Sequence, residues 1–93
     1  MSPEERRLDG NAAAGLLYEV FGTEITAAPE TCANCRTTRP MGAAHVYADA
    51  PGVVIRCPAC EGMLICIVRV GDRLLVDLSG IGGLELLVEP DSI

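Results

Sequence analysis

Two pairs of cysteines limit what this chain can fold into more than any other feature of its sequence. Cys32 and Cys35 lie in the segment TCANCRTTRP, and Cys57 and Cys60 lie in RCPACEG, with twenty-one residues between the pairs. Four thiolates on two tight turns can surround one Zn²⁺ as a tetrahedron, with Zn–S bonds of about 2.3 Å. The spacing therefore predicts a structural zinc site with these four cysteines as ligands. Because four protein sulfurs leave no open coordination position, such a site would not activate water.

The size of the chain gives a reason for a metal. Ninety-three residues predict a single domain, with residues 1–8 as a flexible start and residues 9–93 as one folded unit. The sequence contains no Trp, one Phe and two Tyr, so its core lacks the large buried area that aromatic side chains bring. Zinc binding contributes an apparent ~10–16 kcal/mol in small domains, comparable to the whole free energy of unfolding. We expect metal binding to be the main source of the stability of the fold.

The charge of the chain limits which classes of partner are expected. The formal net charge is −6, and all seven basic residues are arginines. A negative field concentrates neither nucleic acid nor an anionic membrane surface, so neither is expected as a partner. No apolar segment near the N-terminus has the form of a signal peptide, and the longest apolar run, residues 63–68, is too short to cross a bilayer. We expect a cytoplasmic protein, where thiols stay reduced and paired cysteines suggest metal or catalysis.

The segment LDGNAAAGLLYEVFG predicts one helix, from Gly10 or Asn11 to Phe21. Asp9 or Asn11 can cap its first N–H groups, and Gly22 suits a left-handed end. Gly15 either weakens the helix or lets another backbone approach closely. One apolar face is formed by Ala13, Leu16, Leu17, Val20 and Phe21. We expect this face to cover a sheet rather than to bind a partner.

The rest of the chain predicts strands and turns. The expected strands are residues 23–28, 43–50, 53–57, 63–70, 74–79 and 84–90, the last one ended by Pro90. Turns are expected at 51–52 and 71–73. The Gly-rich segment 80–83 predicts a loop, and a phosphate-binding role is not expected because the chain has no lysine. The expected fold class is a small α+β domain, with an N-terminal helix followed by an antiparallel β zinc ribbon and a hairpin extension.

Three arginines, Arg36, Arg39 and Arg56, flank the cysteine pairs. A zinc ion with four thiolates carries a charge of −2, which these guanidinium groups could offset together with backbone N–H groups. They could equally form a small cationic patch that grips a carboxylate, a phosphate or an acidic partner. The sequence leaves both readings open.

His45 and Cys66 are weaker candidates for the metal site. His45 could replace one cysteine ligand, but it is expected to be a polar strand residue because four thiols are already present. Cys66 lies in MLICIVRV, and we expect it to pack as a small buried residue on the strand face of Leu64, Val68 and Val70. A reactive thiol is not expected there, since no cation or helix start lies beside it in the sequence.

Two cysteine pairs that lead into β-hairpins resemble a zinc ribbon, and CPAC is similar to the knuckles of that group. In such knuckles glycine usually follows the second cysteine, whereas Arg36 and Glu61 stand there in this chain. The segments LDGNAAAGLLYEVFGTEIT, YADAPGVVIRCPAC and RLLVDLSG also resemble a family of short bacterial proteins of unknown function, over residues 8 to about 80. The resemblance implies a zinc-ribbon-like fold with the same four cysteine ligands, and it implies no activity.

These features favour a structural zinc module that binds another protein or associates with itself. One alternative is a nucleic-acid or transcription-associated zinc ribbon, which the acidic charge disfavours. Another is a rubredoxin-like iron electron carrier, which the scarcity of aromatic residues disfavours. Thiol–disulfide chemistry would need a helix start at a cysteine pair, and none is evident. An enzyme is not expected, because one histidine and no paired nucleophile and base leave nothing to run the chemistry.

Overall fold

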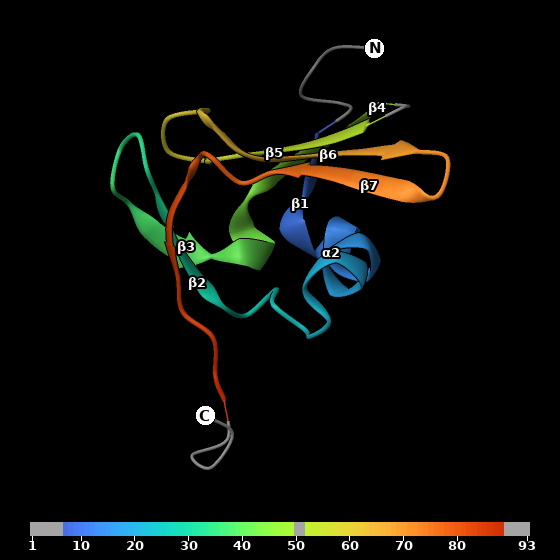
Figure 1. Ribbon diagram of the computed structural model, residues 1–93. Coiled ribbons are helices and arrows are strands. Elements are labelled where there is room, and N and C mark those ends of the chain that lie inside the picture. Colours follow the sequence, from blue (N-terminus) through green and yellow to red (C-terminus); the bar gives the residue numbers. More distant parts are fainter. Residues whose placement is uncertain (1–6, 50–51, 89–93) are drawn as a thin grey trace.

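Over the residues that the structure describes, the domain contains two antiparallel sheets, one α-helix and two 3-10 turns, which confirms the α+β class (Figure 1). The computed structural model describes residues 7–49 and 52–88. The larger sheet has the order β1-β4-β5-β6-β7, formed by β1 (Arg7–Asp9), β4 (His45–Asp49), β5 (Gly52–Arg56), β6 (Met63–Val70) and β7 (Arg73–Asp77). The smaller sheet has the order β3-β2-β8, formed by β2 (Pro29–Cys32), β3 (Thr38–Pro40) and β8 (Ile81–Leu84). The helical segments are η1 (Gly10–Ala13), α2 (Ala14–Phe21) and η2 (Met41–Ala43).

The predicted N-terminal helix is present as the 3-10 turn η1 continued by α2. The Asp9 side chain accepts a hydrogen bond from the Asn11 backbone N–H (3.1 Å), and Gly22 ends the helix in the left-handed region at φ 72°. A Cβ on Gly15 would meet no atom within 4 Å, so of the two roles expected for this glycine only the weakening of the helix applies. Among the described residues, no helix is long and apolar enough to cross a membrane.

The core lies between the larger sheet and the elements beneath it. In Figure 1 this sheet crosses the top of the molecule, with α2 under one part and β2 and β3 under the other. The inner face of β5 and β6 carries Ile55, Ile65 and Ile67, and Leu17 of α2 is fully buried against the same core. The helix therefore covers the sheet, as its apolar face predicts.

The strand predicted at 23–28 is wrong, because these residues form a turn and β2 begins only at Pro29. The Glu24 carboxylate accepts hydrogen bonds from the Thr26 backbone N–H (2.7 Å) and from the Thr26 hydroxyl. A side chain that bonds nearby backbone groups competes with strand pairing. The same two hydrogen bonds lower the pKa of the Glu24 carboxyl.

The loop predicted at 80–83 is also wrong, since residues 81–84 form β8 and pair with β2. Glycine disfavours strands in general, but here it gives room for the first cysteine turn. A Cβ on Gly82 would lie 3.1 Å from Arg36 Nη1 and 3.2 Å from Ala33 Cα. The strand predicted at 84–90 is wrong for residues 85–88, which belong to no strand, and residues 89–90 lie outside the described part.

Smaller differences concern the ends of the other strands. Residues 7 and 8, placed by the sequence in a flexible start, belong to β1 and pair with β4, whereas residues 1–6 lie outside the described residues. Gly52, expected in a turn, begins β5 opposite Asp49, and residues 50–51 lie outside the described part. The expected strand at 63–70 is confirmed as β6, and β7 covers 73–77 rather than 74–79.

Cys66 does not lie on the core face of β6, so its predicted burial is wrong. It is half-buried on the outer face of the larger sheet, in a row with Val54 of β5 and Asp77 of β7. The alternate residues Ile65 and Ile67 point inward instead. The physical reason is that MLICIV is apolar at every position, so its pattern does not show which face is buried.

Candidate metal centre

The four cysteines predicted as ligands lie together at one end of the molecule. Cys32 ends β2 and Cys35 lies in the turn that leads to β3, whereas Cys57 and Cys60 lie in the turn between β5 and β6. Their four sulfur atoms all lie within 4.8 Å of one another, and all four are free thiols. The structure thus joins a turn of the smaller sheet to a turn of the larger sheet at this cluster.

The spacing of the sulfurs fits a tetrahedral metal ion. The Sγ atoms of Cys32 and Cys60 are 3.7 Å apart, and so are those of Cys35 and Cys57. A tetrahedron with metal–sulfur bonds of about 2.3 Å has edges of about 3.8 Å. Cys32 and Cys57 are buried, and Cys35 and Cys60 are half-buried, so the cluster lies at the edge of the core. Four thiols in this arrangement can hold a metal ion.

The two cysteine turns share one backbone form. In the first, the Arg36 N–H donates to the Cys32 carbonyl (2.9 Å), and in the second the Glu61 N–H donates to the Cys57 carbonyl (2.8 Å). Arg36 and Glu61 are the two described non-glycine residues with positive φ, at 65° and 61°. The turn geometry that glycine usually provides is therefore kept at both positions by residues with side chains.

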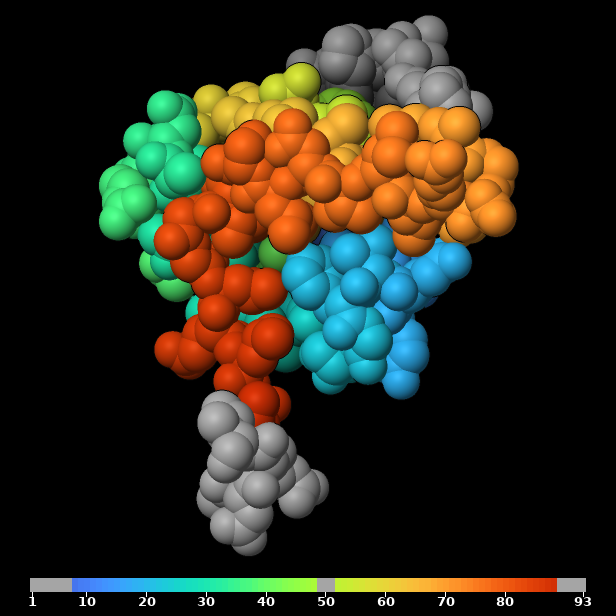
Figure 2. All heavy atoms as spheres, viewed as in Figure 1, coloured from blue at the N-terminus to red at the C-terminus, as the bar shows by residue number. Residues whose placement is uncertain are grey.

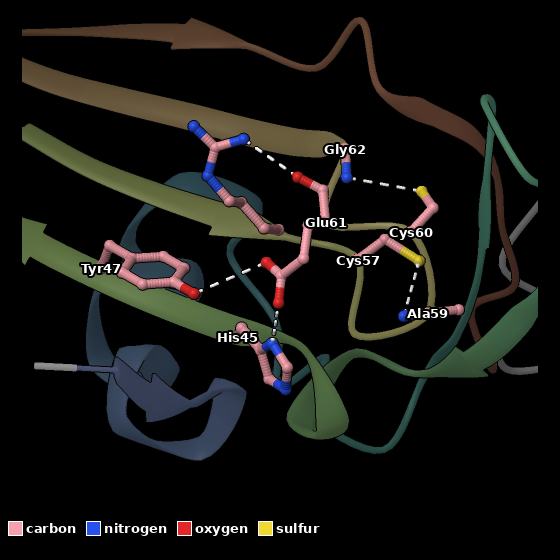
Figure 3. Close-up of polar contacts among 8 residues, drawn as sticks. His45, Tyr47, Cys57, Ala59, Cys60, Glu61 and Gly62 are labelled. Carbon is pink, nitrogen blue, oxygen red and sulfur yellow. Dashed lines mark hydrogen bonds and ion pairs between the residues drawn. The ribbon is translucent and has the colours of Figure 1, made fainter. Parts of the chain in front are cut away.

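Hydrogen bonds reach the sulfurs from both turns. The backbone N–H groups of Ala59 and Gly62 donate to Cys57 Sγ and Cys60 Sγ, each at 3.4 Å (Figure 3). The side-chain amide of Asn34 crosses from the first turn and donates to Cys60 Sγ at 3.4 Å. N–H···S contacts of this kind stabilise thiolates in metal sites. Sequence reasoning missed Asn34, because its partner lies on the other cysteine turn.

These contacts set different pKa values for the thiols. Hydrogen bonding with the side chain and backbone of Thr37 lowers the pKa of Cys35 to about 6. The Asn34 amide, together with the Gly62 N–H, lowers the pKa of Cys60. Burial raises the pKa of Cys57 to about 11. Cys57 therefore holds its proton more tightly than Cys35 and Cys60 do.

Glu61 connects the second cysteine turn to the outer face of β4. Its Oε1 lies 2.9 Å from His45 Nδ1, and the Tyr47 hydroxyl donates to its Oε2 at 3.5 Å (Figure 3). Arg56 Nη1 donates to the Glu61 backbone carbonyl at 3.0 Å. His45 is therefore a polar strand residue that lies outside the thiol cluster, as predicted. Its contact with Glu61 could not be predicted, because residues 45 and 61 lie on different elements.

The three flanking arginines have different surroundings. Arg56 is bonded to the second turn, as described above. Arg36 extends over Gly82 of β8. Arg39 is exposed on β3, opposite Glu30 of β2, and its charge opposes the rise that burial causes in the pKa of the Glu30 carboxyl. Among the described contacts, Arg56 is thus the one of the three whose guanidinium group donates a hydrogen bond to a cysteine turn.

Gly80 joins the cluster to both sheets. Its N–H donates to the Leu64 carbonyl of β6 (3.2 Å), and its carbonyl accepts from the Ala33 N–H of the first cysteine turn (2.9 Å). A Cβ on Gly80 would lie 1.7 Å from the Met63 carbonyl oxygen. Only glycine allows the chain to approach β6 this closely. Leu64, whose carbonyl accepts the Gly80 N–H, is fully buried.

Comparison with known proteins identifies a family but no activity. A family model described as a family of unknown function (DUF6510) matches residues 3–89. No curated protein and no solved structure matches the chain. The expected likeness to a family of unknown function is confirmed, and the likeness to zinc ribbons stays a prediction.

Proposed function

This chain belongs to the DUF6510 family of unknown function, and from its four-thiol cluster we propose that it is a non-catalytic zinc module that binds another protein or a second copy of itself. The observation that carries the proposal is the cluster itself, with Sγ–Sγ distances of 3.7 Å across the two turns. Four thiolates satisfy the tetrahedral preference of Zn²⁺ completely. A metal held in this way stabilises structure and leaves no position for a substrate.

The position of the cluster supports a structural role. It connects β2 and β3 of the smaller sheet with β5 and β6 of the larger one. The strands of the smaller sheet have only three or four residues each, so this sheet has few backbone hydrogen bonds of its own. A metal ion bonded to cysteines of both turns would hold the smaller sheet against the larger one.

The exposed surface supports an interaction role. Several large apolar side chains of the β6–β7 region are exposed, among them Val70 (54%), Leu75 (53%) and Leu78 (42%). Leu87 and Val88, after β8, are exposed as well. Val70 and Leu75 are diagonal neighbours on one face of the β6–β7 pair, and exposed apolar side chains that lie together support a contact with another protein.

Metal analysis of the purified protein tests the metal part of the proposal. We expect one zinc ion per chain by native mass spectrometry and elemental analysis, and no visible absorption. The double variant Cys57→Ser/Cys60→Ser should lose the metal, whereas Cys66→Ser should keep it because Cys66 lies outside the cluster. A visible iron–thiolate absorption would replace this proposal by an electron carrier, and a metal-free wild type would overturn it.

Association tests the interaction part. The metal-loaded wild type and Cys66→Ser should form the same complex, either with themselves or with a protein that copurifies from the native cells. The Cys57→Ser/Cys60→Ser variant should lose it. A complex that persists in this double variant would separate the interaction from the metal site and contradict the proposed link.

A further inference from the structure

The outer edge of β7 is one of the two hydrogen-bonding edges of the larger sheet. β7 is the last strand in the order β1-β4-β5-β6-β7, so one of its sides pairs with β6 and the other with no strand of the described chain. Figure 1 shows β7 at the front of the sheet, and Figure 2 shows its orange atoms uncovered above the blue helix. β7 has no proline and no bulge, two of the features that protect an edge strand, and its two charged residues stand at its two ends.

The hairpin register determines which backbone groups face this edge. Gly71 and Asp72 form a two-residue turn, with Val70 opposite Arg73 and φ 62° at Gly71. Residues that flank such a turn form a hydrogen-bonded pair, and hydrogen-bonded pairs then alternate along the ladder. Arg73, Leu75 and Asp77 therefore bond to β6. Leu74 and Val76 direct their N–H and C=O groups outward.

The sequence of β7 is complementary to itself in the antiparallel direction. It reads Arg-Leu-Leu-Val-Asp, with Leu75 at its centre. When two copies pair about Leu75, Arg73 lies opposite the partner's Asp77, and the reciprocal pair forms at the other end. Leu74 lies opposite the partner's Val76, and the two copies of Leu75 face each other. Both ion pairs lie on the same face as Leu75, since residues two apart share a face of a strand.

The backbone permits this same register. Leu74 and Val76 are the residues with outward N–H and C=O groups, and the register about Leu75 pairs them with each other as hydrogen-bonded pairs. Leu75 and the charged residues then occupy the closer, non-hydrogen-bonded positions, where cross-strand side chains interact most strongly. A parallel arrangement would instead place Arg73 beside the partner's Arg73. Charge and hydrogen bonding thus select one orientation.

We propose that a second copy of this chain pairs antiparallel along β7 and forms a two-fold dimer with a continuous sheet of ten strands. The occupant follows from charge complementarity, because Arg73 and Asp77 stand at equal distances from Leu75. The contact is isologous, as closed two-fold dimers require. It would cover Leu75, which is 53% exposed, and part of Val76, which is 37% exposed. The proposal rests on the self-association named under the proposed function and identifies its surface.

A charge-exchange experiment on the zinc-loaded protein tests this dimer. Sedimentation velocity from about 1 µM to about 1 mM, the range of weak to moderate affinity, should show a monomer–dimer equilibrium for the wild type. Arg73→Asp and Asp77→Arg should each weaken the dimer about tenfold or more, because each places like charges opposite each other twice. An equimolar mixture of the two variants should restore a heterodimer, since opposite charges then face each other at both ends. The double variant Arg73→Asp/Asp77→Arg should restore a homodimer.

The controls separate this proposal from the metal proposal. Native mass spectrometry of each variant measures its zinc content together with its oligomeric state. Glu85→Arg makes the same type of charge change as Asp77→Arg on an exposed residue outside β7, and it should leave the dimer unchanged. A zinc-loaded wild type that stays monomeric, or a mixture that forms no heterodimer, would overturn the β7 dimer and leave the zinc module standing. A metal-free protein would contradict the zinc module instead.

Discussion

At the residue scale, the most informative positions are the two that follow the second cysteine of each pair. Arg36 and Glu61 occupy the left-handed region that favours glycine. Non-glycine residues there carry a conformational cost of roughly 1–2 kcal/mol. Glu61 has contacts that can offset this cost, because its carboxylate lies at hydrogen-bonding distance from His45 and Tyr47.

Replacement of Glu61 separates the conformational cost from the side-chain contacts. Glu61→Ala removes the contacts with His45 and Tyr47 but keeps the conformational cost of a side chain at positive φ. Glu61→Gly removes both the contacts and that cost. We expect Glu61→Ala to have the lower free energy of unfolding, by about 1 kcal/mol, in urea titrations of the zinc-loaded protein. Arg36→Ala and Arg36→Gly form the matched control pair in the first turn and should differ in the same direction. Equal stability of the two Glu61 variants would show that the turn does not hold residue 61 in this conformation.

Sequence reasoning finds the cysteines but not the groups around them. The x2 spacing of each pair and the presence of a second pair predict the cluster of Cys32, Cys35, Cys57 and Cys60, which the structure brings together. Asn34 and Glu61 act on groups of other turns or strands. Such contacts depend on how the elements meet in space, and a single sequence carries no periodic pattern for them.

At the element scale, Gly80 and Gly15 differ in whether their surroundings leave room for a side chain. Gly80 lies so close to β6 that a Cβ would meet the Met63 carbonyl oxygen at 1.7 Å, whereas a Cβ on Gly15 of α2 would point into open space. The segment 80–83 looks like a loop in sequence because glycines disfavour strands. This segment nevertheless contains most of β8, because it pairs with the edge of β2. Its glycines also fit against the first cysteine turn, where a Cβ on Gly82 would come close to Ala33 and Arg36.

The same substitution should therefore have opposite effects at the two sites. Gly80→Ala must push the connection before β8 away from β6, and we expect it to lower the free energy of unfolding by more than about 2 kcal/mol. Gly15→Ala should raise it by about 0.5–1 kcal/mol, because alanine favours the helix. Thermal and urea unfolding of both variants measure these effects. A neutral Gly80→Ala would mean that this connection is not packed against β6.

Elements with a clear pattern in their own sequence can be predicted, whereas elements that form only through contacts with another segment cannot. The helix has a cap, an apolar face and a terminal glycine, and β6 is a long apolar run, so both were predicted with their limits nearly correct. The turn at 23–28 and strand β8 depend on a side-chain hydrogen bond and on pairing with β2. The predicted burial of Cys66 on β6 is wrong for a related reason, since only the packing of the sheet decides which of its faces is covered.

At the scale of the whole molecule, the cluster connects two sheets of unequal strength. The larger sheet has five strands and contributes buried aliphatic side chains from β4, β5 and β6, whereas the smaller has three short strands and contributes none. Glu30 of β2 is 1% exposed, and its Oε2 has no hydrogen-bond partner within the described part of the chain. An unpaired buried oxygen costs about 1–3 kcal/mol, which weakens the smaller sheet further.

Removal of the metal should therefore loosen the smaller sheet first. After chelation of the zinc-loaded protein, we expect amides of β2, β3 and β8 to lose hydrogen-exchange protection by at least about tenfold before those of β5 and β6 do. The Cys66→Ser variant, with its cluster intact, should respond as the wild type does. Equal loss in both sheets would indicate a single cooperative unit, and unchanged protection in both would contradict a structural metal.

The pairing of β2 with β8 also has a consequence for the order in which the domain can assemble. Glu30 pairs with Leu84, 54 positions later, whereas Arg56 pairs with Met63 within one hairpin. Distant pairings form late, because the entropy of closing a long loop must be overcome first. During synthesis the turn with Cys57 and Cys60 can close soon after it leaves the ribosome. The turn with Cys32 and Cys35, although made earlier, must wait for residue 84 before its sheet is complete.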